Sequence, residues 1–299
     1  TEQAGKLWHT SNMFKIKGQE ELAAKYTRDC FADVVFFTNS GTEAIEGSLK
    51  TARKYHSANG NPERIDIIGF QGSFHGRSYA AINASGTPAY LEGFGPRLPG
   101  FIQVPYGDEA ALRAAISPTT AALIIEPVQG EGGVRAVPEE TLRLYRKLAD
   151  ENGFLIIFDE VQSGAGRTGK MWAHQWSGMT PDIMAVAKGV GGGFPMGAFM
   201  ATKEAAKGMV VGVHGTTFGG NPLAMAVGNA AYDELSKPAF LEHVNKVANY
   251  LSQSLEGLKD RHPNLVVDTR GKGLLRGIKL TVNPKDIQAK LRARKVLVG

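Results

Sequence analysis

Residues 138–159, PEETLRLYRKLADENGFLIIFD, contain the helix-to-strand pattern that decides the fold. Apolar residues recur at helical spacing in the first part, which predicts an amphipathic helix over Pro138–Asn152: Leu142, Tyr145, Leu148 and Ala149. Pro138 suits the first position of this helix, and Gly153 supplies its stop. The five apolar residues Phe154–Phe158 then predict a short strand that is buried on both faces.

The same alternation extends along most of the chain. Five more short apolar runs are predicted to be buried strands: Val34–Phe37, Ile65–Ile68, Phe101–Val104, Leu123–Ile125 and Ile183–Ala187. Strands that alternate with helices predict an α/β fold, in which helices flank both faces of a mostly parallel sheet. Ligands of such sheets bind beyond the carboxyl ends of the strands, so a site is expected at that edge.

The pattern changes after Pro222. Helix-forming residues continue to about His262, and shorter elements are predicted after them: strands at Leu265–Thr269, Gly273–Leu280 and Val296–Val298, and a basic helix at Asp286–Lys295. We therefore predict a large domain over residues 1–235 and a smaller α/β C-terminal domain over residues 236–299, which looks incomplete.

The composition is that of an ordinary globular protein, with 42% apolar and 21% charged residues. No apolar run approaches the ~20 residues that a membrane span needs, so no membrane is expected as a partner. The excess of 34 − 29 = 5 basic residues is scattered along the chain, so no nucleic acid is expected either. One cysteine, Cys30, and no leader-like start predict a cytoplasmic protein. Glycine accounts for 37 of 299 residues, which predicts tight turns and close backbone contacts with a ligand.

Three predicted strands run directly into an ionisable residue: Glu126, Asp159 and Lys188. Because parallel strands end at the same edge of a sheet, we expect these side chains at one place. An amine in apolar surroundings has a lowered pKa and can act as a nucleophile, although a lysine whose head reaches water would fit as well. A buried Asp159 needs a partner, which could be a backbone cap, an arginine or a protonated cofactor ring.

Residues 38–44, TNSGTEA, follow the strand Val34–Phe37 and have the features of a helix start. Ser40 and Glu43 have capping-box spacing, and an apolar face continues behind them. Free backbone N–H groups at Gly41 and Thr42 could bind an anion such as phosphate. A plain capped helix would explain the same residues.

Residues 164–170, GAGRTGK, match two nucleotide-binding patterns in part. Met171 stands where a P-loop needs a serine or threonine for magnesium, and no convincing helix start follows the glycines. Nucleotide binding through this loop therefore stays the weaker hypothesis, and no metal site is predicted.

An isolated lysine, an aspartate after a strand and an anion-binding helix start are the groups that pyridoxal 5'-phosphate (PLP) needs. With further motifs in order along nearly the whole chain, they make the sequence resemble the class III PLP-dependent aminotransferases of fold type I. The motifs are Ser40–Ala44, Phe74–Arg77, Glu126–Gly133, Asp159–Gln162, Ala187–Lys188, Gly191–Pro195 and His214–Pro222.

The resemblance implies a role for each matching residue. Lys188 would form a Schiff base with the cofactor and move the substrate proton, and Asp159 would pair with the protonated ring nitrogen. Further cofactor contacts are implied for Gly41 and Thr42 at the phosphate, Phe74 and Val161 on the two ring faces, Gln162 near the phenolic oxygen, and Thr217 at the phosphate of the neighbouring subunit.

The resemblance also implies carboxylate sites for the substrates. Arg77 would clamp a substrate carboxylate, since a planar guanidinium matches that target, and Thr216 would lie near the substrate. Glu131 and Arg270 would form a switch pair, whose salt bridge opens so that Arg270 can bind the α-carboxylate of glutamate or 2-oxoglutarate.

The implied enzyme is a homodimer with shared active sites. It would move the terminal amino group of N2-acetyl-L-ornithine to 2-oxoglutarate, giving N-acetyl-L-glutamate 5-semialdehyde and L-glutamate in arginine biosynthesis. Alternative donors are ornithine, succinyl-diaminopimelate and 4-aminobutyrate, and a PLP aminomutase is a weaker alternative. Family members carry further segments before the position of Thr1 and after that of Gly299, and the N-terminal segment of the family helps to shape the substrate pocket.

Overall fold

A seven-stranded sheet lies at the centre of the protein, whose structure is a computed structural model describing residues 2–299. In order across the sheet, its strands are β1 (Val34–Thr38), β9 (Gly197–Ala201), β8 (Ile183–Val186), β7 (Leu155–Asp159), β4 (Thr120–Ile125), β2 (Asp66–Phe70) and β3 (Phe101–Val104). The five strands from β8 to β3 are parallel, whereas β9 is antiparallel to both of its neighbours. The predicted α/β fold with a mostly parallel sheet is confirmed.

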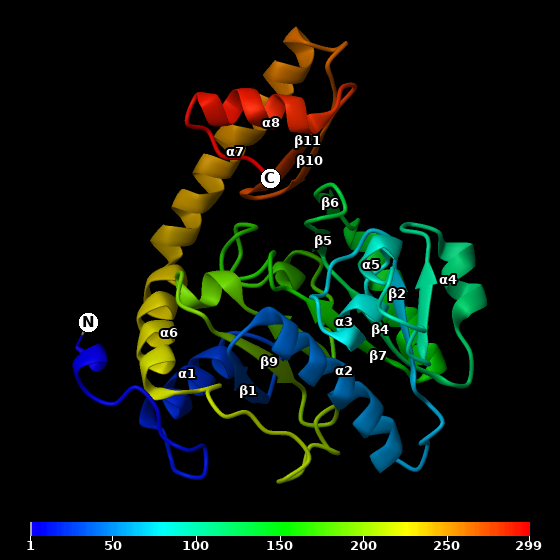
Figure 1. Ribbon diagram of the computed structural model, residues 1–299, viewed down its shortest axis with the longest axis vertical. Coiled ribbons are helices and arrows are strands. Elements are labelled where there is room, and N and C mark those ends of the chain that lie inside the picture. Colours follow the sequence, from blue (N-terminus) through cyan, green and yellow to red (C-terminus); the bar gives the residue numbers. More distant parts are fainter. Residues whose placement is uncertain (1) are drawn as a thin grey trace.

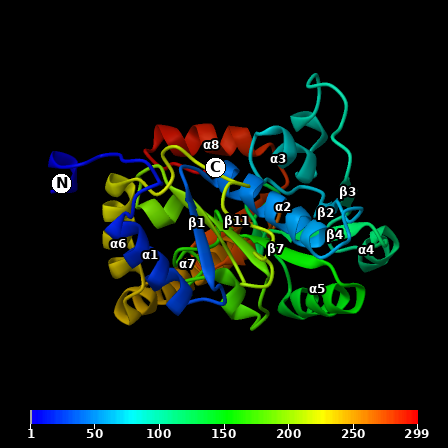
Figure 2. The same cartoon turned by 90° about the horizontal axis from the view of Figure 1, so that it is seen from below.

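Helices cover both faces of this sheet, and Figure 2 shows the sheet between α2 and α5. The helices are α1 (Lys17–Arg28), α2 (Gly41–Ala58), α3 (Tyr79–Ala84), α4 (Glu109–Ala115), α5 (Glu139–Asn152), α6 (Pro222–Leu235), α7 (Pro238–Arg261) and α8 (Pro284–Ala293). Successive residues of a strand point to opposite faces. In β7, Ile156 therefore packs in the core that includes α5 and Ile157 in the core that includes α2, and both are fully buried.

The helix α5 and the strand β7 form where the sequence predicts them. All four predicted apolar residues of α5 are buried, and Gly153 ends the helix with a left-handed φ of 68°. Pro138, however, is the residue before the helix and not its first residue, since its ψ of 141° is extended. Asp159 is the last residue of β7, which places its side chain at the carboxyl end of the sheet.

The structure differs from the sequence predictions at two strands. The sequence did not reveal β9, because its residues are mostly small and follow a glycine-rich stretch that resembles a loop. Conversely, Val296–Val298 form no strand: Leu297 is 84% exposed, and no neighbouring strand among residues 2–299 pairs with this segment.

Shorter elements complete the described chain. A small sheet joins β5 (Val128–Gln129) and β6 (Arg135–Ala136). The 3₁₀ turns are η1 (Gln3–Gly5), η2 (Pro88–Tyr90), η3 (Ala173–Trp176) and η4 (Lys188–Gly191).

The C-terminal elements gather at one end of the molecule, above the central sheet in Figure 1. There α7 leads to an antiparallel hairpin of β10 (Val266–Lys272) and β11 (Leu275–Leu280), followed by α8. The helical stretch predicted to about His262 forms two helices, α6 and α7, and the two strands and the basic helix are confirmed with slightly shifted bounds. The domain division after residue 235 stays a prediction. Across residues 2–299, no helix combines the length and apolarity that a membrane crossing requires.

Candidate active site

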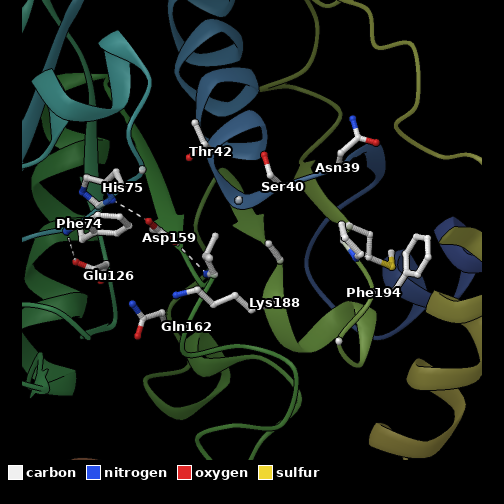
Figure 3. Close-up of a pocket in the computed structure, with 17 residues that line it drawn as sticks. Asn39, Ser40, Thr42, Phe74, His75, Glu126, Asp159, Gln162, Lys188 and Phe194 are labelled. Carbon is white, nitrogen blue, oxygen red and sulfur yellow. Dashed lines mark hydrogen bonds and ion pairs between the residues drawn. The ribbon is translucent and has the colours of Figure 1, made fainter. Parts of the chain in front are cut away.

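The carboxyl ends of β4, β7 and β8 meet at one cavity of about 390 Å³. Glu126, Asp159 and Lys188 all line it, as expected from three strands that end at the same edge. The start of α2 forms another wall with Gly41 and Thr42. Figure 3 shows the Lys188 side chain extending toward Asp159 and Gln162.

Lys188 has an unusual backbone conformation at the head of η4. Its φ of 49° is left-handed, which is uncommon for a residue other than glycine and concentrates at functional sites. Its side chain opens into the pocket, yet partial burial lowers the pKa of the amine. The carboxylates of Asp159, Glu131 and Glu126 act in the opposite direction. Desolvation dominates, so a larger fraction of the amine is neutral and nucleophilic than in a free lysine.

Asp159 is only 4% exposed and is held by two donors. Its Oδ2 lies 2.8 Å from Nδ1 of His75, and its Oδ1 accepts a hydrogen bond from the Val161 backbone N–H at 3.0 Å. The sequence did not identify His75 as this partner, and its only signal was its place in the motif Phe74–Arg77. An ionised carboxylate has about four acceptor sites, so Asp159 can still accept a hydrogen bond from the pocket.

Glu126 is a second buried carboxyl group, with 3% exposure. It accepts hydrogen bonds from the backbone N–H groups of Phe74 at 3.1 Å and Gly130 at 3.2 Å. Burial raises the pKa of Glu126 to about 7. Through its two hydrogen bonds, Glu126 holds two loops of the pocket together. The sequence placed Glu126 at this edge of the sheet but did not assign this role to it.

The start of α2 has unsatisfied backbone donors that face the pocket. Ser40 caps the helix by accepting from the Glu43 N–H at 3.3 Å, as predicted, but Glu43 accepts from the Asn39 N–H rather than from Ser40. Within residues 2–299, no acceptor is bonded to the N–H groups of Gly41 and Thr42. A helix of this length with two free N–H groups at its start favours an anion there.

Phe74, Val161 and Gln162 also line the pocket. Gln162 donates from Nε2 to Oε1 of Glu131 at 3.2 Å. All seven residues predicted to contact the cofactor within one chain therefore lie together: Gly41, Thr42, Phe74, Asp159, Val161, Gln162 and Lys188.

The other five predicted residues do not line this pocket: Arg77, Thr216, Thr217, Glu131 and Arg270. Arg77 is exposed beside it, and its guanidinium carbon lies 3.9 Å from the ring centre of Tyr90 and 5.4 Å from that of Phe74. Thr216 is half-buried and Thr217 exposed, and both lie in the surface segment between β9 and α6.

The predicted ion pair between Glu131 and Arg270 is not formed. Arg270 donates from Nε to Oδ2 of Asp268 at 2.6 Å. Asp268 and Arg270 are two positions apart on β10, so their side chains lie on the same face of the strand. The guanidinium therefore binds this neighbouring carboxylate. The Arg270 guanidinium nevertheless lies close to Gly133, two residues from Glu131.

The glycine-rich loop at 164–170 has a structural role. Asn245 of α7 donates to the Gly169 carbonyl at 2.8 Å, and Leu274 donates to the Arg167 carbonyl at 2.9 Å. No α-helix begins behind the loop, and a 3₁₀ turn follows instead. A Cβ at Gly169 would collide with Oδ1 of Asn245, so the contact with α7 explains this glycine without a nucleotide.

The fold and the pocket define an α/β enzyme that combines a lysine amine, a buried carboxylate and an anion-binding helix start. The family model for aminotransferase class III matches residues 1–299, and the chain belongs to that family.

Relatives support this assignment along the whole chain. Acetylornithine aminotransferase 2 of Caulobacter vibrioides is 61% identical over 299 residues, which cover 99% of this chain and 74% of the relative. Acetylornithine aminotransferase of Brucella melitensis is 57% identical over 295 residues, which cover 99% of this chain and 73% of the relative. The ornithine aminotransferase of Toxoplasma gondii superposes with a TM-score of 0.94 at 30% identity, covering 99% of this chain and 72% of that one.

Class III aminotransferases depend on PLP and act on amino acids and 2-oxo acids. The pocket fits this cofactor. Asp159 has acceptor capacity for a ring N–H, the helix start has free donors for a phosphate, and Lys188 supplies an amine for an aldehyde. Glycine is also needed close by, since a Cβ at Gly76 would collide with Oγ1 of Thr42.

Proposed function

We propose that this transaminase moves the terminal amino group of N2-acetyl-L-ornithine to 2-oxoglutarate. The products would be N-acetyl-L-glutamate 5-semialdehyde and L-glutamate, in arginine biosynthesis. The observation that carries the proposal is the identity of 61% and 57% to two acetylornithine aminotransferases over 99% of the chain. Ornithine is the weaker candidate donor, because the ornithine aminotransferase of Toxoplasma gondii is 30% identical.

PLP, when bound, supplies the electron-withdrawing ring that makes the proton beside the substrate amino group acidic. Asp159 would accept a hydrogen bond from the ring nitrogen and keep that nitrogen protonated. Its contact with His75 and its burial favour a fixed orientation of the carboxylate. Gly41 and Thr42 would bind the phosphate, Phe74 and Val161 would pack on the two ring faces, and Gln162 would lie near the phenolic oxygen.

Lys188 would bind the cofactor covalently and transfer the substrate proton. Its Nζ would hold the cofactor through the aldehyde carbon, and as a free amine it would take the proton from the substrate carbon that bears the amino group. A pKa lowered by burial suits both tasks, because the amine must be neutral to attack and to accept a proton. Proton transfer by a positioned base is worth about 10²–10⁴-fold in rate.

Two arginines would recognise the carboxylates of the substrates. Arg77 at the rim would clamp one carboxylate, with Thr216 near the bound substrate. Arg270 would take the α-carboxylate of glutamate or 2-oxoglutarate, and it would have to exchange its bond with Asp268 for that contact. Glu131, bonded to Gln162, would lie beside this exchange.

We also propose a homodimer in which Thr217 reaches the phosphate site of the neighbouring subunit. Thr217 lies beside Phe218 in a surface segment that contacts the N-terminal segment, where the rings of His9 and Phe218 are 4.8 Å apart. Large apolar side chains of these two segments are exposed, among them Trp8, Met13, Phe14, Val211 and Phe218. Exposed apolar side chains of this size favour a protein partner, and a second copy fits the implied shared site. A cytoplasmic setting is part of the proposal, since Cys30 has no partner for an internal disulfide.

The visible absorption of the PLP-loaded protein tests the donor. N-acetylornithine should bleach the cofactor band, and 2-oxoglutarate should restore it. Lys188→Ala should lose turnover by more than 10²–10⁴-fold, while Lys170→Ala, in the glycine-rich loop, should retain it. A band that responds to ornithine or 4-aminobutyrate but not to N-acetylornithine would replace the donor and leave the transaminase assignment intact.

A further inference from the structure

The Arg77 side chain is bound in a different way from the other arginines that contact aromatic rings. Arg53 lies over Phe101 but also donates hydrogen bonds to the backbone, for example to the Ile65 carbonyl at 2.9 Å. Arg135 lies over Tyr106 and donates to Gln129 at 2.6 Å. These two arginines use their donors for the structure of the protein itself.

Arg77, by contrast, is held by aromatic rings alone. Its guanidinium carbon is 3.9 Å from the Tyr90 ring centre, the shortest cation–ring distance recorded for residues 2–299, and 5.4 Å from the Phe74 ring centre. No hydrogen bond or ion pair engages its side chain within this part of the chain. Because no acceptor among these residues is bonded to the guanidinium, its N–H donors stay available for a carboxylate.

Tyr90 is itself fixed by its surroundings. It ends the turn η2, where its backbone N–H donates to the Thr87 carbonyl at 3.1 Å. Its ring meets that of Phe74 edge to face, with centres 5.7 Å apart and planes at 89°. Phe74 lines the pocket, so Tyr90 joins the arginine at the rim to a wall of the cofactor site.

We propose that Tyr90 is a positioning residue that orients Arg77 toward the carboxylate of the substrate. This inference rests on the proposed clamp role of Arg77 and deepens it. A flexible arginine must lose side-chain freedom when it binds, and a ring already in contact with its guanidinium reduces that loss. Tyr90 therefore favours substrates that carry a carboxylate over simple amines.

The test uses the PLP-loaded protein with Tyr90→Leu, Tyr90→Phe, Arg77→Gln and the double variant Arg77→Gln/Tyr90→Leu. Tyr90→Leu should raise the KM for N-acetylornithine by about 2- to 30-fold, the range of a cation–π contact, with kcat nearly unchanged. Tyr90→Phe keeps the ring and should keep the KM. Pentylamine, a primary amine without a carboxylate, should react equally well with wild type and Tyr90→Leu.

The double variant separates a positioning role from a merely structural one. If Tyr90 acts through Arg77, the change Tyr90→Leu should have no further effect on KM once Arg77 is glutamine. Additive effects, an unchanged KM in Tyr90→Leu, or an equal loss with pentylamine would each overturn the inference. PLP affinity, followed by cofactor absorption, should stay within about threefold, since Phe74 and not Tyr90 lines the pocket.

Failure of the underlying proposal would look different. A wild-type protein that does not use N-acetylornithine would refute the donor. An Arg77→Gln variant with wild-type KM would refute the clamp, and with it the role of Tyr90. A raised KM in Arg77→Gln together with an unchanged KM in Tyr90→Leu would refute Tyr90 alone.

Discussion

Gly41 should be indispensable for tight PLP binding, because α2 begins in close contact with another wall of the pocket. A Cβ at position 41 would lie 2.9 Å and 3.1 Å from the two γ-methyl carbons of Val161 and 3.4 Å from Cβ of Ala187. Favourable carbon–carbon contacts lie at about 3.5–4.0 Å, so Gly41→Ala must displace Val161 or the first turn of α2. Either movement disturbs a group that we assign to the cofactor.

Overpacking of this kind costs about 1–3 kcal/mol. If the strain is borne by the pocket, PLP should bind about 5- to 150-fold more weakly to Gly41→Ala. A titration of the apoprotein with PLP, followed by absorption, measures this directly. Thermal unfolding of the apoprotein reports any part of the cost that falls on the fold itself.

Gly257→Ala is the matched control. This glycine lies within α7, where an added Cβ would meet only the end of the Arg261 side chain at 3.3 Å. Alanine is the better helix former by about 1 kcal/mol, so the control should raise the unfolding temperature and leave PLP affinity unchanged. Gly41→Ala with PLP affinity within twofold of wild type would refute the close-packing argument.

Two further predictions concern the buried carboxyl group of Glu126 and the partly buried carboxylate of Asp182. The pKa of Glu126 is raised to about 7 in the folded protein, whereas a glutamate of the unfolded chain has a pKa near 4.3. Between these two pKa values the folded protein holds a proton that the unfolded chain has lost. Protonation of Glu126 therefore stabilises the folded protein at low pH, and this contribution is lost as the pH rises through 7. The free energy of unfolding, measured with urea, should fall between pH 5 and pH 8 by up to about 3 kcal/mol more in wild type than in Glu126→Gln. A difference between the two proteins that does not change with pH would contradict this. Asp182→Asn should cost about 1–3 kcal/mol, because Oδ2 accepts from Arg146 and from the Ile156 N–H, both at 2.7 Å. Asp150→Asn, whose side chain is 63% exposed, should cost less than about 0.5 kcal/mol, and equal costs would show that burial does not decide the difference.

The sequence by itself determined the fold class and the edge of the sheet where the site lies. Both follow from local information: apolar periodicity sets each helix and strand, and the order of elements forces a mostly parallel sheet. Glu126, Asp159 and Lys188 were placed together on this ground alone, and they line one pocket. The role of each residue came from the family resemblance and not from spacing.

Only the tertiary structure decided which side chains touch. His75 meets Asp159 across 84 positions, β9 enters the sheet between β1 and β8, and Arg270 bonds to Asp268 instead of Glu131. Such contacts depend on how distant elements pack, and local periodicity carries no information about that packing. The contact of Arg77 with the Tyr90 ring belongs to this group, because a turn and a loop bring the two side chains together only in the folded chain.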